Sequence, residues 1–174
     1  MRGIKKIGSI LLLAYFPVVT FADITVARGG YGDINVGYSK VFASDYLEDV
    51  MGLGLNFNLG YKMMPFFAFE MGYTTYGASK SSFTGANAID AALKGIIPFV
   101  EVGMEIFAKI GPVYVVNSKL PDDVSNHTTN VYYGFGGAYA WSPTMLVTLQ
   151  WAQASGNSNT GNFQLLSIGA TYIF

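Results

Sequence analysis

The feature that most constrains the fold of this chain is a strict alternation of side chains between Met51 and Met63. The apolar positions are Met51, Leu53, Leu55, Phe57, Leu59, Tyr61 and Met63. Gly, Asn and Lys occupy the positions between them. A period of two sustained over thirteen residues excludes an amphipathic helix and exceeds the usual length of a strand in a soluble protein. Because roughly 9–11 residues of tilted strand cross a bilayer, the segment predicts a transmembrane β-strand.

The same alternation recurs along the rest of the chain and predicts eight antiparallel strands. These strands span 31–41, 51–63, 66–76, 88–98, 104–116, 131–141, 144–155 and 163–174. Residues 23–30 either extend the first strand or lead into it. Pro112 interrupts the fifth strand, and a proline that cannot donate to the ladder predicts a bulge there.

The connections between these strands alternate in length. Those around 64–65, 100–103 and 142–143 are short, whereas 42–50, 77–87, 117–130 and 156–162 are long and polar. Short periplasmic turns and long external loops are typical of outer-membrane barrels. We therefore predict an all-β, membrane-spanning, eight-stranded antiparallel up-and-down barrel with both mature termini in the periplasm.

The alternative is a soluble barrel, in which the apolar side chains point inward and the polar side chains point outward. Three features disfavour it. Gly, Ala, Ser and Thr dominate the non-apolar face, which suits a narrow lumen, and only 12% of the residues are charged. Aromatic residues also fall at two levels of the apolar face, as interfacial girdles do. They are Tyr61, Phe67, Phe99, Trp141, Tyr172 and Phe174 at the periplasmic level, and Tyr73, Tyr114, Tyr133 and Trp151 at the outer level.

Residues 1–22 have the pattern of a cleaved secretory signal peptide. Arg2, Lys5 and Lys6 precede an apolar stretch over 7–19, and Ala22 ends a plausible cleavage site. A membrane anchor is the alternative, but the apolar stretch is shorter than the roughly 20 residues of a spanning helix. The predicted domains are therefore the signal peptide, 1–22, and the barrel, 23–174.

The chain has no Cys and no basic patch, so disulfides, thiolate metal sites and nucleic-acid partners are not expected.

The final segment alternates as a strand that closes the barrel. Gly169, Tyr172 and Phe174 match the assembly signal found in the closing strand of bacterial outer-membrane barrels, although Ile168 replaces the polar residue expected before the Gly. Four further short motifs occur in matching order. They are Gly37-Tyr38-Ser39, Lys94-Gly-Ile-Ile-Pro98, Ala108-Lys-Ile-Gly111 and Tyr132-Tyr-Gly134.

On these motifs the mature chain resembles the OmpA-like eight-stranded outer-membrane barrel family. The resemblance implies a Gram-negative outer-membrane protein in contact with lipid and lipopolysaccharide. It also implies periplasmic chaperones and the barrel-assembly machinery as folding partners. No peptidoglycan-binding domain is expected after the barrel.

Four charged residues fall on the predicted inner face: Glu70, Lys94, Glu105 and Lys109. Counting along the strands places Glu70, Lys94 and Lys109 at one height, with Glu105 nearer the periplasm. We therefore predict a lumenal ion-pair cluster that plugs the barrel, which the resemblance also implies. A switchable gate that passes ions is the alternative.

No enzyme activity, cofactor or metal site is predicted. Some eight-stranded barrels remove acyl chains from lipid A with a His-x-Ser motif and an acid, but here Thr129 replaces the Ser after His127, the only histidine. No Asp or Glu follows Asp123, so a downstream acid to orient the imidazole is missing. We interpret 122–127 as a solvated loop, and Asp45, Glu48 and Asp49 as hydrated surface charges.

The predicted function is that of a structural, adhesin-like protein whose external loops bind host or surface ligands, because loops on a rigid frame carry recognition. A narrow porin-like ion channel and a lipid A-modifying enzyme are the alternatives.

Overall fold

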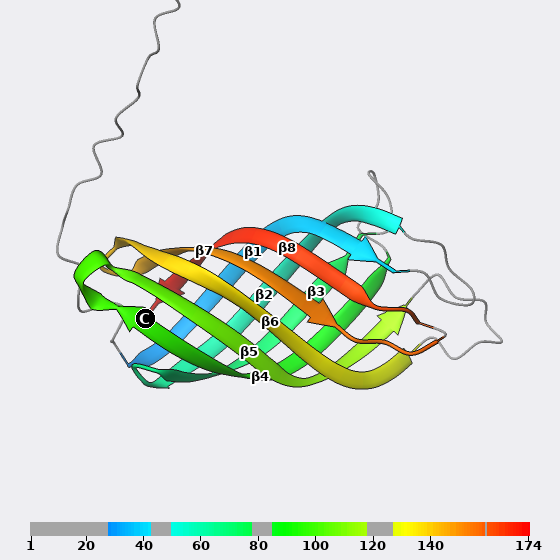
Figure 1. The fold of residues 1–174 in the computed structure, drawn as a ribbon, viewed down its shortest axis with the longest axis horizontal. Helices are drawn as coiled ribbons and strands as arrows, with labels where there is room; N and C mark the ends of the chain where they lie inside the picture. Colours follow the sequence, from blue (N-terminus) through cyan, green and yellow to red (C-terminus); the bar gives the residue numbers. More distant parts are fainter. Residues whose placement is uncertain (1–27, 43–49, 78–84, 118–126, 159) are drawn as a thin grey trace, which may run out of the picture.

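The computed structural model of the protein describes residues 28–42, 50–77, 85–117, 127–158 and 160–174. Eight strands, each antiparallel to its neighbours, form a closed barrel in sequence order, and β1 pairs with β8 to close it (Figure 1). The strands are β1 (Gly29–Val41), β2 (Val50–Met64), β3 (Phe67–Tyr76), β4 (Ala86–Phe99), β5 (Met104–Asn117), β6 (His127–Ser142), β7 (Met145–Ala154) and β8 (Phe163–Ile173). The predicted fold class is confirmed.

A short 3-10 helix, η1 (Val100–Val102), connects β4 to β5 and ends at Gly103 in the left-handed conformation. Among the described residues, no helix is long and apolar enough to cross a membrane.

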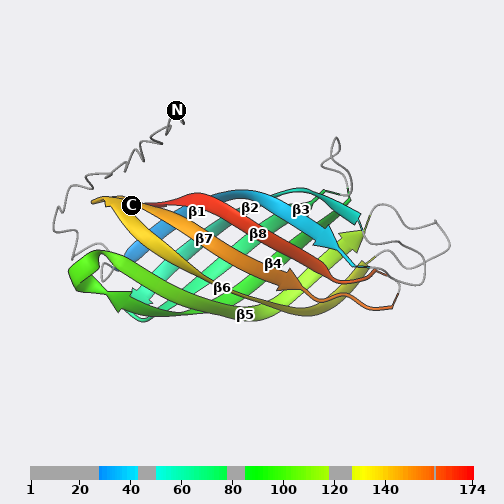
Figure 2. The ribbon, with the colours of Figure 1, turned by 45° about the horizontal axis from the view of Figure 1, so that its top comes forward.

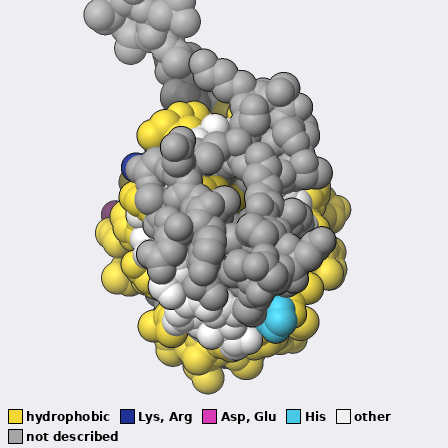
Figure 3. Space-filling view, turned by 90° about the vertical axis from the view of Figure 1, so that its right-hand side faces the viewer, with side chains coloured by type: hydrophobic (Ala, Val, Ile, Leu, Met, Phe, Trp, Pro, Cys, Tyr) yellow, Lys and Arg dark blue, Asp and Glu magenta, His cyan; other side chains and the backbone are white. Residues whose placement is uncertain are grey.

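The period of two directs the side chains to two faces of the wall. Apolar side chains point outward, as with Leu59, which is 69% exposed, and Leu149, which is 59% exposed. Small and polar side chains point inward, and Asn56 and Gln150 are buried. In β8 the predicted faces are confirmed, because Ile168 is exposed and the residues on either side of it are not. Viewed along the barrel axis, hydrophobic side chains surround the molecule (Figure 3).

The two ends of the barrel differ in their connections. Tight connections join β2 to β3, β4 to β5 and β6 to β7 at one end, which we call the short-turn end. The strand ends that flank the longer connections lie together at the opposite end, the long-loop end (Figures 1 and 2). Phe174 lies at the short-turn end, where its backbone N–H donates to the Gly30 carbonyl at 3.0 Å.

Two details of the predicted strands are wrong. Strand β6 begins at His127, within the predicted loop, because residues 127–130 continue the ladder with β5 residues 113–116. Pro112 causes no bulge, because the register on both sides of it is unchanged. The β4–β5 ladder instead omits the two pairs between Asp90–Val113 and Leu93–Ile110, which accommodates the missing donor without an inserted residue. The register shifts that do occur, in β2 and β6, lie beside the short turns.

Several predicted features fall outside the described residues. They are the signal peptide, residues 23–27 and the charged residues Asp45, Glu48 and Asp49.

Candidate functional site: the lumenal polar network

The barrel interior is divided into layers along its axis. An apolar layer at the long-loop end includes Tyr76, Tyr132 and Phe163. A second apolar layer at the short-turn end includes Tyr31 and Phe107. Buried polar and charged side chains such as Asn56 and Glu70 lie between them, whereas Glu105 is nearer the short-turn end than Phe107. The interior cavity found beside Tyr31 has a volume of only about 10 Å³, at the lower limit of the space that one water molecule needs.

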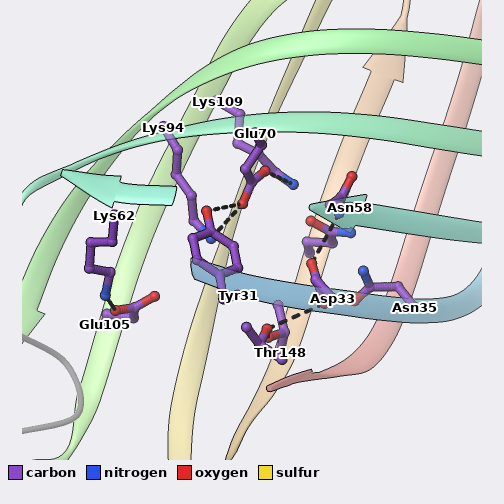
Figure 4. Close-up of polar contacts among 12 residues, drawn as sticks. Tyr31, Asp33, Asn35, Asn58, Lys62, Glu70, Lys94, Glu105, Lys109 and Thr148 are labelled. Carbon is purple, nitrogen blue, oxygen red and sulfur yellow. Dashed lines mark hydrogen bonds and ion pairs between the residues drawn. The ribbon is translucent and has the colours of Figure 1, made fainter. Parts of the chain in front are cut away.

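Glu70 is the centre of the charged part of this interior (Figure 4). Its Oε1 accepts hydrogen bonds from the Tyr31 hydroxyl at 2.7 Å and from Lys94 Nζ at 2.9 Å. Its Oε2 forms an ion pair with Lys109 Nζ at 2.9 Å. Lys94 and Lys109 are directly opposite each other on β4 and β5, and Glu70 compensates the repulsion between them. Lys94 Nζ also lies 4.2 Å from the centre of the Phe107 ring.

Glu105 belongs to a separate ion pair. Its Oε2 lies 2.9 Å from Nζ of Lys62, and both side chains are buried. The structure therefore brings together Glu70, Lys94 and Lys109 as predicted, but Glu105 pairs with a lysine that the sequence analysis left out. The inward position of Lys62 is visible in the alternation of 51–63. Its partner is not, because β2 and β5 are not neighbouring strands and the pair spans the lumen.

A cluster of buried amides continues the network away from the ion pairs. Asn56 Oδ1 accepts from Asn35 Nδ2 at 3.0 Å, from Asn58 Nδ2 at 2.7 Å and from Gln150 Nε2 at 3.0 Å. Asn58 Nδ2 also donates to Asp33 Oδ2 at 3.0 Å. These bonds join β1, β2 and β7 across the lumen, so the polar layer is cross-linked as well as filled. The sequence analysis did not identify this cluster, although its members follow the inward alternation.

His127 lies apart from this network. It is exposed near the start of β6, and its ring centre is 6.0 Å from that of Tyr114. Tyr114 points outward, so His127 is on the opposite side of the wall from the buried carboxylates. Among the described residues, no group of three or more His, Cys, Asp or Glu side chains is arranged to hold a metal ion.

The three residues of the predicted assembly signal lie on both faces of β8 and just beyond it. Tyr172 and Phe174 are exposed on the outer face. Gly169 is opposite Asn35 of β1, and a Cβ at this position would lie 2.7 Å from Asn35 Cγ. Gly169 therefore has a steric role in closing the barrel, whereas recognition of the signal by other proteins stays a prediction.

Comparisons with known proteins identify the same architecture. The family model described as "OmpA-like transmembrane domain" matches residues 30–174. The crystal structure of Neisserial surface protein A (NspA) is similar with a TM-score of 0.64 and 18% identity, over 84% of this chain and 97% of that one. The N-terminal β-barrel domain of Pseudomonas aeruginosa OprF is similar with a TM-score of 0.59 and 12% identity, over 85% of this chain and 100% of that one.

A third solved structure is the attachment invasion locus protein Ail of Yersinia pestis, in complex with the heparin analogue sucrose octasulfate. It is similar with a TM-score of 0.53 and 15% identity, over 84% of this chain and 99% of that one. The comparison with curated proteins found no match. At these identities the solved structures establish the fold, and the family model establishes the family.

Proposed function

This chain belongs to the OmpA-like transmembrane domain family of outer-membrane barrels, and from that premise we propose that it is a closed scaffold that presents its long-loop end for binding at the cell surface. The observation that carries the proposal is the packing of the lumen. Ion passage requires a continuous polar path, and apolar layers that contain Tyr76 and Phe107 interrupt the polar lining of the lumen.

The ion pairs support a plug in place of a pore. The Lys62–Glu105 pair connects β2 to β5, and the Glu70 group connects β3 to β4 and β5. An eight-stranded barrel has an interior just wide enough for its own side chains. Charges that are paired across such an interior hold the walls together and leave no wide channel between them.

The long-loop end supports the binding part of the proposal. Residues 127–130 of β6 pair with 113–116 of β5 and extend past the β6–β7 ladder, which begins at Tyr132. His127, Thr129 and Asn130 are all exposed on it. A strand end that is held by its ladder to the barrel wall can present residues to a ligand at low entropic cost. The complex of Ail with a heparin analogue is a precedent for ligand binding by this fold.

The proposed orientation places the long-loop end outside the cell and the short-turn end in the periplasm. Outward-facing polar residues at the long-loop end support it. Gln164 Nε2 donates to Gln153 Oε1 at 2.8 Å, and Gln164 is opposite Lys40. This row follows the apolar wall at the level where lipid or lipopolysaccharide head groups would lie. Periplasmic chaperones and the assembly machinery would act before this orientation is reached.

We expect the purified barrel to be non-conducting. In planar bilayers, the wild-type protein should show no current steps above the lipid baseline at moderate voltages, because the lumen is filled. The variant Phe107→Ala removes a large side chain from the short-turn layer. It tests whether the bilayer recording can detect a lumen that has been partly opened. Regular steps from the wild-type protein would instead support the channel alternative.

We expect only the long-loop end to be accessible from outside the cell. Because the chain has no Cys, single-cysteine variants give an unambiguous label. Ser158→Cys, exposed between β7 and β8, should react on intact cells with a maleimide that cannot cross membranes. Glu101→Cys, exposed in η1, is the matched control and should react only after lysis. The reverse pattern would invert the proposed orientation.

A further inference from the structure

The buried charges of the lumen do not balance. Among the described residues, the charged side chains that are buried are Asp33, Lys62, Glu70, Asp90, Lys94, Glu105 and Lys109. They comprise four carboxylates and three ammonium groups, which leaves one negative charge uncompensated. All three lysines are engaged by Glu70 or Glu105. The excess charge therefore resides with Asp33 and Asp90.

The two aspartates differ in their partners. Asp33 accepts a hydrogen bond on each oxygen, from Asn58 Nδ2 at 3.0 Å and from Thr171 Oγ1 at 3.3 Å. Asp90 is only 3% exposed, and its Oδ2 has no hydrogen-bond partner among the described residues. Burying a carboxylate is unfavourable unless something compensates its charge. Asp90 is thus where the lumen lacks a positive charge.

Three side-chain oxygen atoms lie together beside Gly72, two of them from Asp90. On three neighbouring strands, Asn58, Gly72 and Asp90 are directly opposite one another. Because the middle residue is Gly, the side chains on both sides fold over its Cα. A Cβ on Gly72 would lie 2.6 Å from Asn58 Oδ1, 2.5 Å from Asp90 Oδ2 and 2.8 Å from Asp90 Oδ1. Three acceptor oxygens therefore converge above Gly72.

The hydrogen bonds of Asn58 fix which of its side-chain atoms faces Gly72. Its Nδ2 donates to Asp33 Oδ2 and to Asn56 Oδ1, at 3.0 and 2.7 Å. Rotating the amide by half a turn would lose both bonds, so its oxygen is the atom that faces Gly72. Asn58 Oδ1 accepts one hydrogen bond, from Asn56 Nδ2 at 3.1 Å, and lies beside a carboxylate whose Oδ2 accepts none from the described residues. A positively charged ligand resolves both the repulsion and the missing charge.

We propose that Asp90 and Asn58 bind a monovalent alkali cation, such as Na⁺, between their side-chain oxygens beside Gly72. Carboxylate and amide oxygens are the ligands that hard cations prefer. A single charge matches the single excess carboxylate. A divalent ion would leave one positive charge in excess, and the described residues hold no group of three or more His, Cys, Asp or Glu that could offset it. The bound cation joins β2 to β4 across β3 through the side chains of Asn58 and Asp90.

Unfolding in urea tests the proposal on the intact barrel in detergent micelles. NaCl is compared with N-methyl-D-glucamine chloride at equal ionic strength, so that general screening is constant. An ion that binds only the folded state lowers the unfolding equilibrium constant, by about 11-fold when its concentration is ten times Kd. We expect this decrease with Na⁺, with saturation, and no decrease with the bulky organic cation.

Three variants assign the effect to the site. Asp90→Asn keeps the shape of the side chain but removes its charge, and should abolish the Na⁺ dependence. Gly72→Ala places a methyl group between the oxygens and should abolish it too. Glu105→Gln, which alters a buried carboxylate with its own lysine, should retain it. A crystal soaked in Tl⁺ should show an anomalous peak next to Asp90 and Asn58.

Unfolding that is the same in both salts would overturn the proposal, and it is the result expected if Asp90 instead carries a proton. Na⁺ dependence that persists in Asp90→Asn would also overturn it.

Discussion

Glu70→Ala is expected to destabilise the barrel by about 3–5 kcal/mol, because it leaves two buried lysines without an anion. Lys94 and Lys109 are directly opposite on adjacent strands, and each is within 2.9 Å of a Glu70 oxygen. Removing the carboxylate turns a compensated group into two like charges in a lumen that is too tightly packed for solvation. The Tyr31 hydroxyl also loses its acceptor. The midpoint of urea unfolding in detergent micelles, followed by tryptophan fluorescence, measures the loss.

Two controls separate the charge effect from the removal of a side chain. Glu101→Ala removes an exposed carboxylate from η1 and should change the unfolding free energy by no more than about 0.5 kcal/mol. Adding Lys94→Met and Lys109→Met to Glu70→Ala replaces the buried ions with apolar side chains, which is often neutral or stabilising. The triple variant should therefore recover much of the lost stability. If Glu70→Ala alone unfolded at the wild-type midpoint, the ion pairs of Glu70 would contribute nothing to the stability of the barrel.

The distribution of side chains between the two faces could be predicted from the sequence because it depends on one physical rule. Successive side chains of a strand point to opposite faces, so the apolar character of Leu59 places Asn58 and Gly60 inside. A barrel wall with lipid outside penalises any one-residue slip, since it would move a whole apolar set inward. Strand number followed from the same rule, because each segment is separated from the next by a turn or a polar connection.

The pairing of residues across the lumen could not be predicted in the same way. Alternation shows that Lys62 and Glu105 point inward but not that they meet, because the contact depends on the tilt and stagger of strands on different sides of the barrel. The extent of β6 was missed for a related reason. Residues 127–130 are polar and read as a loop, yet their ladder with β5 continues past the end of the β6–β7 ladder. Pro112 likewise indicated a bulge, whereas the ladder omits two pairs and keeps its register.

Gly169→Ala is expected to prevent most of the protein from closing into the barrel. A Cβ on this residue would overlap the Ile34 backbone carbonyl and the Asn35 side chain, both on β1. The backbone oxygen cannot move aside without breaking the ladder between β1 and β8, which is the closing seam of the barrel. Gly95→Ala is the matched control, because a Cβ there meets nothing within 4 Å. The folded fraction after refolding into lipid vesicles is measured by the difference in gel mobility between unheated and heated samples.

The same pair of variants separates the steric role of Gly169 from its predicted role in the assembly signal. Refolding of purified protein into vesicles requires no chaperone or assembly machinery, so a defect there comes from packing alone. We expect Gly169→Ala to fail in vesicles and in cells. Tyr172→Ala and Phe174→Ala truncate exposed outer-face side chains, and should refold in vesicles but assemble poorly in cells if the signal is read there. Normal refolding of Gly169→Ala would show that the seam tolerates a methyl group, and its role would then be recognition.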